Sequence, residues 1–221
     1  MRLIDRMNAA CSTYLDSFPY RPYFDLHNCI FIHIPKCAGS SILSALANDG
    51  RIYRDHATWF DYYRCNTYKF KDYYKFSVSR DPFDRAASSY YYMLNGGNQM
   101  EDLVYKHLFE ANKMTFEKFI LKFLNQHRIH EIPLLRPQYL FVYDSQRDLK
   151  VDKIIRFGDL KEEFPLVARR LGLKQMILRR SNVTDRKDNV VDLLSNAAVR
   201  ERIVKLYEPD FELLGYPKMV V

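Results

Sequence analysis

The sequence lacks long apolar runs. In 221 residues no stretch is long enough to cross a membrane or to form the core of a signal peptide. Glycine and proline are also scarce, at 7 and 9 residues, and they gather into no flexible linker. With 48% hydrophobic and 15% aromatic residues the chain has ample material for a packed core, which excludes disorder. We therefore predict a single domain over residues 1–221, with residues 1–27 as a peripheral lead-in.

Cysteine is scarce as well, and no two cysteines have the spacing of a metal or redox pair. Cys11, Cys29, Cys37 and Cys65 form no C-x-x-C motif. Neither a zinc site nor a disulfide framework is indicated, and we expect no metal. This usage is typical of a reducing compartment, so we expect a cytoplasmic protein.

The charge balance is basic and predicts acidic partners. Lys and Arg number 34 against 27 Asp and Glu, which gives a net charge of +7. Such a charge suits a polyphosphorylated nucleotide, an anionic glycan, a membrane surface or nucleic acid. Because the basic residues are spread along the chain and form no arm, the pattern argues against nucleic acid. Peripheral contact with a membrane stays open.

Residues 30–42 are the stretch around which the rest of the sequence is organised. Residues 30–34 form a short apolar, β-branched run that suits a strand buried on both faces, and Pro35 ends it because proline has no N–H to donate. An apolar helical pattern starts at residue 39. This order aims backbone N–H groups and a helix N-terminus at one point, which favours an anion. The residues expected at the anion site are Lys36, Cys37, Ala38, Gly39, Ser40 and Ser41.

The loop differs from a nucleotide-binding Walker loop. In that loop the lysine follows the last glycine and a serine or threonine binds magnesium, whereas here Lys36 precedes Gly39. A lysine at the entrance of the loop still reaches the anion, but the metal arrangement is not reproduced. On this motif alone, an ordinary strand-to-helix turn is an equal alternative.

A second polar motif begins where the next strand ends. Residues 74–79 read as that strand, and Arg80 follows at its carboxyl end, where ligands of open α/β sheets bind. Asp81 and Pro82 start a helix as N-cap and first helical residue, and Ser88 lies two turns into it. An arginine fork and a serine hydroxyl suit a terminal phosphate. The alternative is that Arg80 pairs with a neighbouring acid while Ser88 is exposed.

The remaining pattern alternates strands and helices, which predicts a P-loop-like parallel α/β sheet flanked by helices. We expect further helices within residues 100–125 and a loop at residues 127–137. The other expectations are strands at residues 51–54, 139–143 and 153–157, a helix at 159–171 with a kink or later start at Pro165, and a closing helix at 199–207 that stops at Pro209.

The two polar motifs together resemble those of one enzyme family. Residues 34–41 (Ile-Pro-Lys-Cys-Ala-Gly-Ser-Ser) resemble the 5′-phosphosulfate loop of sulfotransferases, and residues 80–90 resemble the 3′-phosphate motif of the carbohydrate sulfotransferases. Residues 55–58 (Asp-His-Ala-Thr) are similar to an H-A-T segment of bacterial family-2-type members. Two positions depart from the family pattern: Asp55 stands where a basic residue is expected, and Gly158-Asp159 replaces an acidic pair.

The resemblance implies a reaction and a set of roles. It implies transfer of a sulfuryl group from 3′-phosphoadenosine 5′-phosphosulfate (PAPS) to a hydroxyl of a carbohydrate or glycolipid, which releases adenosine 3′,5′-bisphosphate (PAP). Lys36 would be catalytic, stabilising the bridging oxygen as the phosphate leaves, and the amides of residues 37–41 would hold the 5′-phosphate. Arg80 and Ser88 would hold the 3′-phosphate, and Arg186 would close over the nucleotide. His56 is the expected general base, the alternative being a surface histidine beside aromatic residues.

Two other functions remain open on the sequence. One is a P-loop-type kinase or nucleotide hydrolase, for which only loose substitutes of the magnesium ligands are present. The other is a non-catalytic module that binds an anionic glycan or nucleic acid. The acceptor hydroxyl and the oligomeric state are not specified by the sequence.

Overall fold

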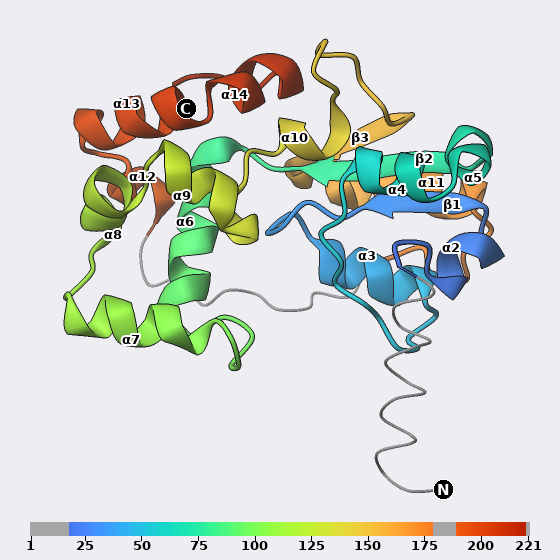
Figure 1. Ribbon diagram of the computed structural model, residues 1–221, viewed down its shortest axis with the longest axis horizontal. Helices are drawn as coiled ribbons and strands as arrows, with labels where there is room; N and C mark the ends of the chain where they lie inside the picture. The colour runs from blue at the N-terminus through green and yellow to red at the C-terminus, as the bar shows by residue number, and fades with distance from the viewer. Residues whose placement is uncertain (1–17, 179–188, 220–221) are drawn as a thin grey trace, which may run out of the picture.

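A computed structural model describes residues 18–178 and 189–219 (Figure 1). Within these residues the chain is a mixed α/β structure with a three-stranded parallel sheet flanked by helices, as predicted. The strands are β1 (Cys29–Ile32), β2 (Tyr74–Ser79) and β3 (Lys153–Arg156). The helices are α2 (Pro22–Leu26), α3 (Gly39–Leu46), α4 (Trp59–Cys65), α5 (Thr67–Asp72), α6 (Pro82–Leu94), α7 (Leu103–Ala111), α8 (Phe116–Lys118), α9 (Gln126–Glu131), α10 (Tyr139–Val142), α11 (Leu160–Arg170), α12 (Val190–Leu193), α13 (Ala197–Leu206) and α14 (Glu208–Leu214), with a π-helical turn at Phe119–Phe123 and 3₁₀ turns at Pro133–Leu135 and Phe157–Asp159.

The sheet has the order β1–β2–β3, with β2 in the centre. Phe31 of β1 is opposite Phe76 of β2, and Ser79 at the end of β2 is opposite Arg156 of β3. All four residues of β1 are buried, as its continuous apolar sequence predicts. Since the strands are parallel, their carboxyl ends meet at one edge, and both polar motifs start there.

Two hydrophobic clusters lie on either side of that edge. One surrounds the sheet and includes side chains of α2, α3 and α11, whereas the other is formed by α6 and the helices around it. In Figure 1 the sheet with α3 and α11 occupies one half of the molecule, and α7, α8 and α13 occupy the other. Helix α6 leads directly from β2 into the helical half. The polar motifs therefore lie at the junction of the two clusters.

Two predicted strands are wrong. Residues 51–54 have no strand partner and form an irregular segment. Residues 139–143 contain helix α10, because the carboxylate of Asp210 accepts hydrogen bonds from the backbone N–H groups of Gln138 (2.9 Å) and Tyr139 (2.8 Å). This cap comes from a residue about 70 positions away in the chain. A local apolar pattern does not reveal it.

The predicted loop at residues 127–137 is also wrong, since most of it is helix α9 and a 3₁₀ turn. The side chain of Asn125 caps α9 by accepting from the N–H of Arg128 at 2.9 Å. Helix α11 begins at Leu160 and continues through Pro165, so the proline does not delay its start. Pro209 does not end the helical C-terminal region, because it lies in the first turn of α14, where proline is tolerated.

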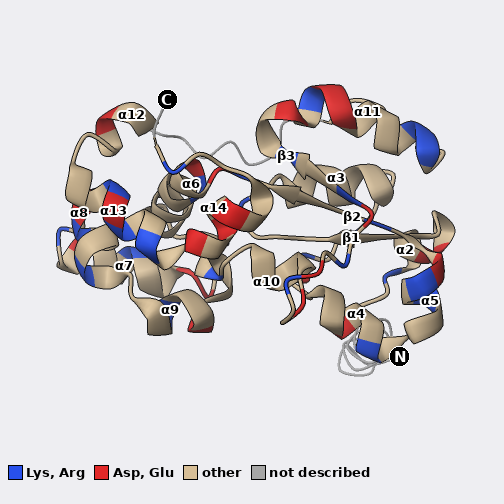
Figure 2. Cartoon of the chain, turned by 90° about the horizontal axis from the view of Figure 1, so that it is seen from above, with Lys and Arg blue, Asp and Glu red and all other residues tan. Residues whose placement is uncertain are grey.

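The predicted peripheral lead-in is partly core. Tyr20, Tyr23 and Phe24 are all buried in the cluster around the sheet, and only residues 18–27 of the lead-in are among those described. Of the described helices, none combines the length and the apolar content of a membrane span. Figure 2 shows Lys and Arg on helices of both halves, among them α5, α11 and α13. The basic charge is thus distributed over the molecule, as its spread along the sequence predicts.

Candidate active site

The loop between β1 and α3 is tightly wound. Lys36 (φ +67°) and Ala38 (φ +60°) both have left-handed backbone conformations, which non-glycine residues adopt at an energetic cost. The N–H of Cys37 donates to the carbonyl of Ile34 at 3.3 Å, and that of Ser41 donates to Ala38 at 3.1 Å. Two of the five amides expected to hold an anion therefore have acceptors within the loop. The N-terminus of α3, where backbone N–H groups point outward along the helix axis, begins directly at this loop.

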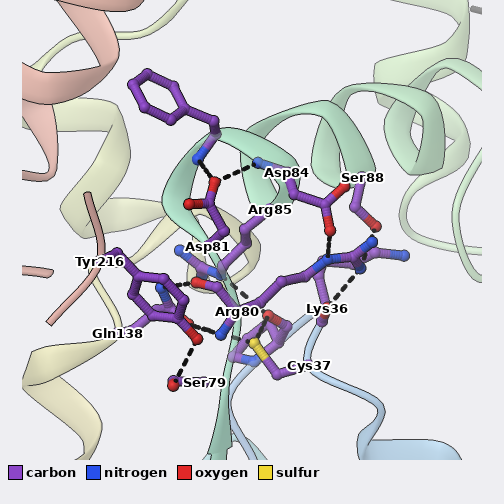
Figure 3. A network of polar contacts seen from close by, with 12 residues as sticks. Lys36, Cys37, Ser79, Arg80, Asp81, Asp84, Arg85, Ser88, Gln138 and Tyr216 are labelled. Atoms are coloured by element: carbon purple, nitrogen blue, oxygen red, sulfur yellow. Dashed lines mark hydrogen bonds and ion pairs between the residues drawn. The ribbon is translucent and has the colours of Figure 1, made fainter. Parts of the chain in front are cut away.

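Arg80 joins this loop to helix α6. Its Nη1 donates to the carbonyl of Lys36 at 2.9 Å and to Oγ of Ser88 at 3.1 Å, and its Nε pairs with Asp84 (Figure 3). Asp81 caps α6 as predicted, since its side chain accepts from the N–H groups of Phe83 and Asp84. The alternative of a paired arginine beside an exposed serine is half right, because Arg80 does pair with an acid but Ser88 is buried.

A buried network that the sequence analysis missed fixes the backbone around Arg80. The side-chain amide of Gln138 accepts from the N–H of Arg80 (2.9 Å) and donates to its carbonyl (2.8 Å). The same amide oxygen accepts from the thiol of Cys37 at 3.4 Å, and Gln138 is itself anchored by Asp210. Neither Gln138 nor Asp210 is exposed to solvent. Both residues lie outside the two polar motifs, so neither motif pointed to them.

Arg85 is a second structural residue that the motif did not reveal. It is buried, and its guanidinium donates to the carbonyls of Pro35 (3.1 Å), Leu134 (3.2 Å) and Arg136 (2.8 Å). These bonds tie helix α6 to the loop between β1 and α3 and to the segment before α10. A buried charge is tolerated only where such hydrogen bonds replace its hydration. The guanidinium of Arg85 therefore fixes the backbone of the loop between β1 and α3.

Cys37 is not a reactive thiol. It has no solvent exposure, and burial raises the pKa of its thiol to about 11, so the group is protonated at neutral pH. Its thiol donates to Gln138. A small, neutral side chain therefore packs beneath the loop.

His56 and His33 form a pair beside the loop. Nδ1 of His56 lies 3.2 Å from the carbonyl oxygen of His33, and the ring centroids are 4.6 Å apart. Because a carbonyl can only accept, Nδ1 of His56 carries the hydrogen, and Nε2 of the neutral ring is left as a proton acceptor. Burial lowers the pKa of His56, although the bond to the carbonyl partly opposes the effect. The ring is therefore predominantly neutral at pH 7.

His33 contacts both the loop and His56. A Cβ placed on Gly39 would be 1.7 Å from Nε2 of His33, so the imidazole lies directly against this glycine. Burial lowers the pKa of His33 far below its usual range, and electrostatic repulsion from its neighbours adds to the effect, including the positive charges of Arg54 and Lys36. His33 thus supports the loop, but its Nδ1 has no hydrogen-bond partner within the described residues.

Asp55 departs from the family pattern, and the structure gives the reason. It forms an ion pair with Nε of Arg21 at 2.6 Å, and the two side chains are 8% and 0% exposed. The guanidinium of Arg21 also lies 4.5 Å from the ring centroid of Tyr53. These contacts hold the irregular segment that carries His56 against the core. Arg54, the next basic residue, is exposed.

The second departure lies beside Arg80. The ring of Phe157, in the turn that contains Gly158 and Asp159, lies 4.2 Å from the guanidinium carbon of Arg80.

Arg186, the remaining expected nucleotide contact, lies outside the described residues. Within the described chain, no three His, Cys, Asp or Glu side chains gather as a metal site would require.

Comparison with known proteins identifies one family. The family profile described as "Sulfotransferase family" matches residues 23–217, which include both polar motifs, His56 and the buried network. Comparisons with curated proteins and with solved structures give no match.

Proposed function

The chain belongs to the sulfotransferase family, and from this premise we propose that it moves a sulfuryl group from PAPS to a hydroxyl of a carbohydrate or glycolipid, with His56 as general base. Adenosine 3′,5′-bisphosphate is the second product. The family supports sulfuryl transfer in general. The donor, the acceptor and the residue roles are part of the proposal.

The donor assignment rests on two hydrogen bonds from Nη1 of Arg80, one to Ser88 and one to the carbonyl of Lys36. They bring the arginine-led helix and the lysine-bearing loop to one place. A donor with a phosphate at each end of its ribose needs two cationic sites at such close range. Arg80 and Ser88 would take the 3′-phosphate, a group that ATP lacks. Lys36 and the backbone amides of Ala38, Gly39 and Ser40, at the start of α3, would take the 5′-phosphosulfate.

The transfer itself requires in-line displacement at sulfur. The acceptor oxygen bonds to sulfur as the bond from sulfur to the bridging phosphate oxygen breaks. Lys36 stabilises the negative charge that develops on that bridging oxygen. Nε2 of His56 takes the proton of the acceptor hydroxyl, because Nδ1 is already committed to the carbonyl of His33. No metal ion is needed in this scheme.

The acceptor class rests on the resemblance of residues 80–90 to carbohydrate sulfotransferases. Aromatic side chains of α4 differ in whether they can stack on a sugar, since Tyr62 is buried whereas Tyr63 is 38% exposed. We propose that the protein is a bacterial, cytoplasmic enzyme that does not bind nucleic acid. Contact with a membrane surface is compatible with a glycolipid acceptor.

A ligand comparison tests the donor assignment. PAP at a hundred times its Kd is expected to raise Tm by about 5 °C or more, while ATP with magnesium at the same concentration leaves Tm nearly unchanged. Stabilisation by ATP and magnesium alone would indicate a kinase. Stabilisation by neither nucleotide, together with steeply salt-dependent binding of heparin, would indicate a non-catalytic binding module. Mass spectrometry of a glycan panel incubated with PAPS then identifies the acceptor.

A further inference from the structure

Helix α6 presents a row of polar side chains toward the loop. Asp84, Ser88 and Tyr92 are spaced by four residues and therefore lie on one face of the helix. The first two contact Arg80. The third lies against the loop lysine, since the ring centroid of Tyr92 is 3.9 Å from Nζ of Lys36. The row thus reaches from the proposed 3′-phosphate site to the residue that faces the leaving group.

We propose that Tyr92 is a positioning residue, which holds the ammonium of Lys36 over its ring and so keeps the lysine aligned for the departing phosphate oxygen. This role rests on the proposed sulfuryl transfer. A lysine side chain has four rotatable bonds, and fixing it beforehand removes an entropic cost from the reaction. An aromatic face attracts an ammonium within about 6 Å of its centroid.

Both ends of Lys36 are then fixed from the same helical segment. Its carbonyl accepts from Arg80, which precedes α6, and its ammonium lies on Tyr92 in the last turn of that helix. The backbone of Lys36 is in the left-handed region. The side chain therefore leaves the loop in a direction that an ordinary backbone conformation would not give. In that direction the ammonium of Lys36 reaches the ring of Tyr92.

The ring of Tyr92 is itself anchored. Burial together with the nearby carboxylate of Asp102 raises the pKa of Tyr92 to about 12, so the phenol stays neutral. Asp102 in turn accepts from the N–H of Asn98 at 3.0 Å and packs against Gly97, where a Cβ would come within 2.4 Å of it. The loop after α6 thus determines where the ring lies.

The contact is tested first in the protein without donor or acceptor. With lysine labelled at the ε-carbon, the NMR signal of Lys36, assigned by Lys36→Arg, should be shifted upfield by the ring in the wild type. The shift should persist in Tyr92→Phe, which retains the ring, and disappear in Tyr92→Leu. A Lys36 signal that is the same in wild type and Tyr92→Leu would overturn the contact, whatever the activity of the protein.

The catalytic consequence is tested by donor cleavage, measured as sulfate released from PAPS in water. Tyr92→Leu should lower the maximal rate by about tenfold while Kd for PAP stays within about twofold, and Tyr92→Phe should keep the rate within about threefold. Tyr105→Leu, which removes a partly buried tyrosine from the adjacent helix, controls for general loosening.

Two results separate the failure of this role from failure of the proposed function. A Tyr92→Leu protein that loses the Lys36 shift but cleaves PAPS at the wild-type rate overturns the positioning role alone. A wild-type protein that neither binds PAP nor cleaves PAPS overturns the proposed sulfuryl transfer, and the positioning role with it.

Discussion

The imidazole of His33 lies where a side chain at residue 39 would begin, with Nε2 only 1.7 Å from the ideal Cβ position of Gly39. The glycine is therefore required for space rather than for an unusual φ angle. The same histidine offers its carbonyl to Nδ1 of His56. One residue of the strand-to-loop junction thus shapes the proposed phosphosulfate loop and orients the proposed base.

Gly39→Ala is expected to lower the free energy of unfolding by about 2 kcal/mol, because the buried ring of His33 cannot move aside freely. Chemical denaturation measures the change. In a His33→Ala background the same substitution should cost less, since the ring is gone. Gly158→Ala is the matched control, as a Cβ there meets nothing within 4 Å, and we expect a change within about 0.5 kcal/mol. Equal losses at the two glycines would contradict this packing.

Local signals in the sequence were sufficient for the elements that carry the polar motifs. The apolar run of β1 and the Asp81-Pro82 start of α6 specify their own structures, and the structure confirms both. Because parallel strands end at one edge, the meeting of Arg80 with the Lys36 loop also follows from the pattern.

The sequence analysis failed where the deciding partner is distant in the chain. Residues 139–143 are a short apolar run that reads as a strand, yet Asp210 caps them as a helix. Asp55 departs from the family pattern because it pairs with Arg21, and only the tertiary structure brings these two residues together. The missed helix α9 is different, because Asn125 is a local N-cap signal that was available.

Asp55→Asn should destabilise the protein by about 3–5 kcal/mol, because it leaves the buried charge of Arg21 without its partner. Asp25→Asn is the matched control. That residue pairs with Lys69 at a similar distance, 2.7 Å, but the pair is 42% and 34% exposed, and its loss should cost at most about 1 kcal/mol. Urea denaturation compares the two variants, and similar losses would show that burial does not govern the Arg21–Asp55 pair.

Arg80→Ala should weaken binding of PAP by about ten- to a hundredfold, since charge-assisted hydrogen bonds to a phosphate would be lost. Arg80→Lys should recover only part of the affinity, because an ammonium does not reproduce the guanidinium fork that reaches Ser88 and Lys36. Isothermal titration calorimetry gives both values. The exposed Arg169 on α11 provides the control, as Arg169→Ala removes the same charge from outside the site. Equal losses for Arg80→Ala and Arg169→Ala would mean that only net charge matters.

His56 should set the acidic limb of the pH profile of kcat/KM. Burial lowers its pKa below the ordinary 6.5, and only the unprotonated ring can accept a proton. The rate is therefore expected to be level above about pH 6.5 and to fall at lower pH, by about tenfold per unit once the pH is below the lowered pKa. A limb centred above pH 6.5 would be incompatible with this environment.

His56→Ala should reduce kcat by about 10²- to 10⁴-fold and remove the acidic limb, while Kd for PAP stays nearly the same because His56 is not among the residues proposed to hold the nucleotide. His127→Ala, at an exposed histidine that pairs with Glu131, should keep both the rate and the limb. His33 does not substitute for the base in the variant, because its ring is buried against Gly39. If His56→Ala retained most of its rate with an unchanged limb, another group would have to take the acceptor's proton, and the assignment of His56 would be wrong.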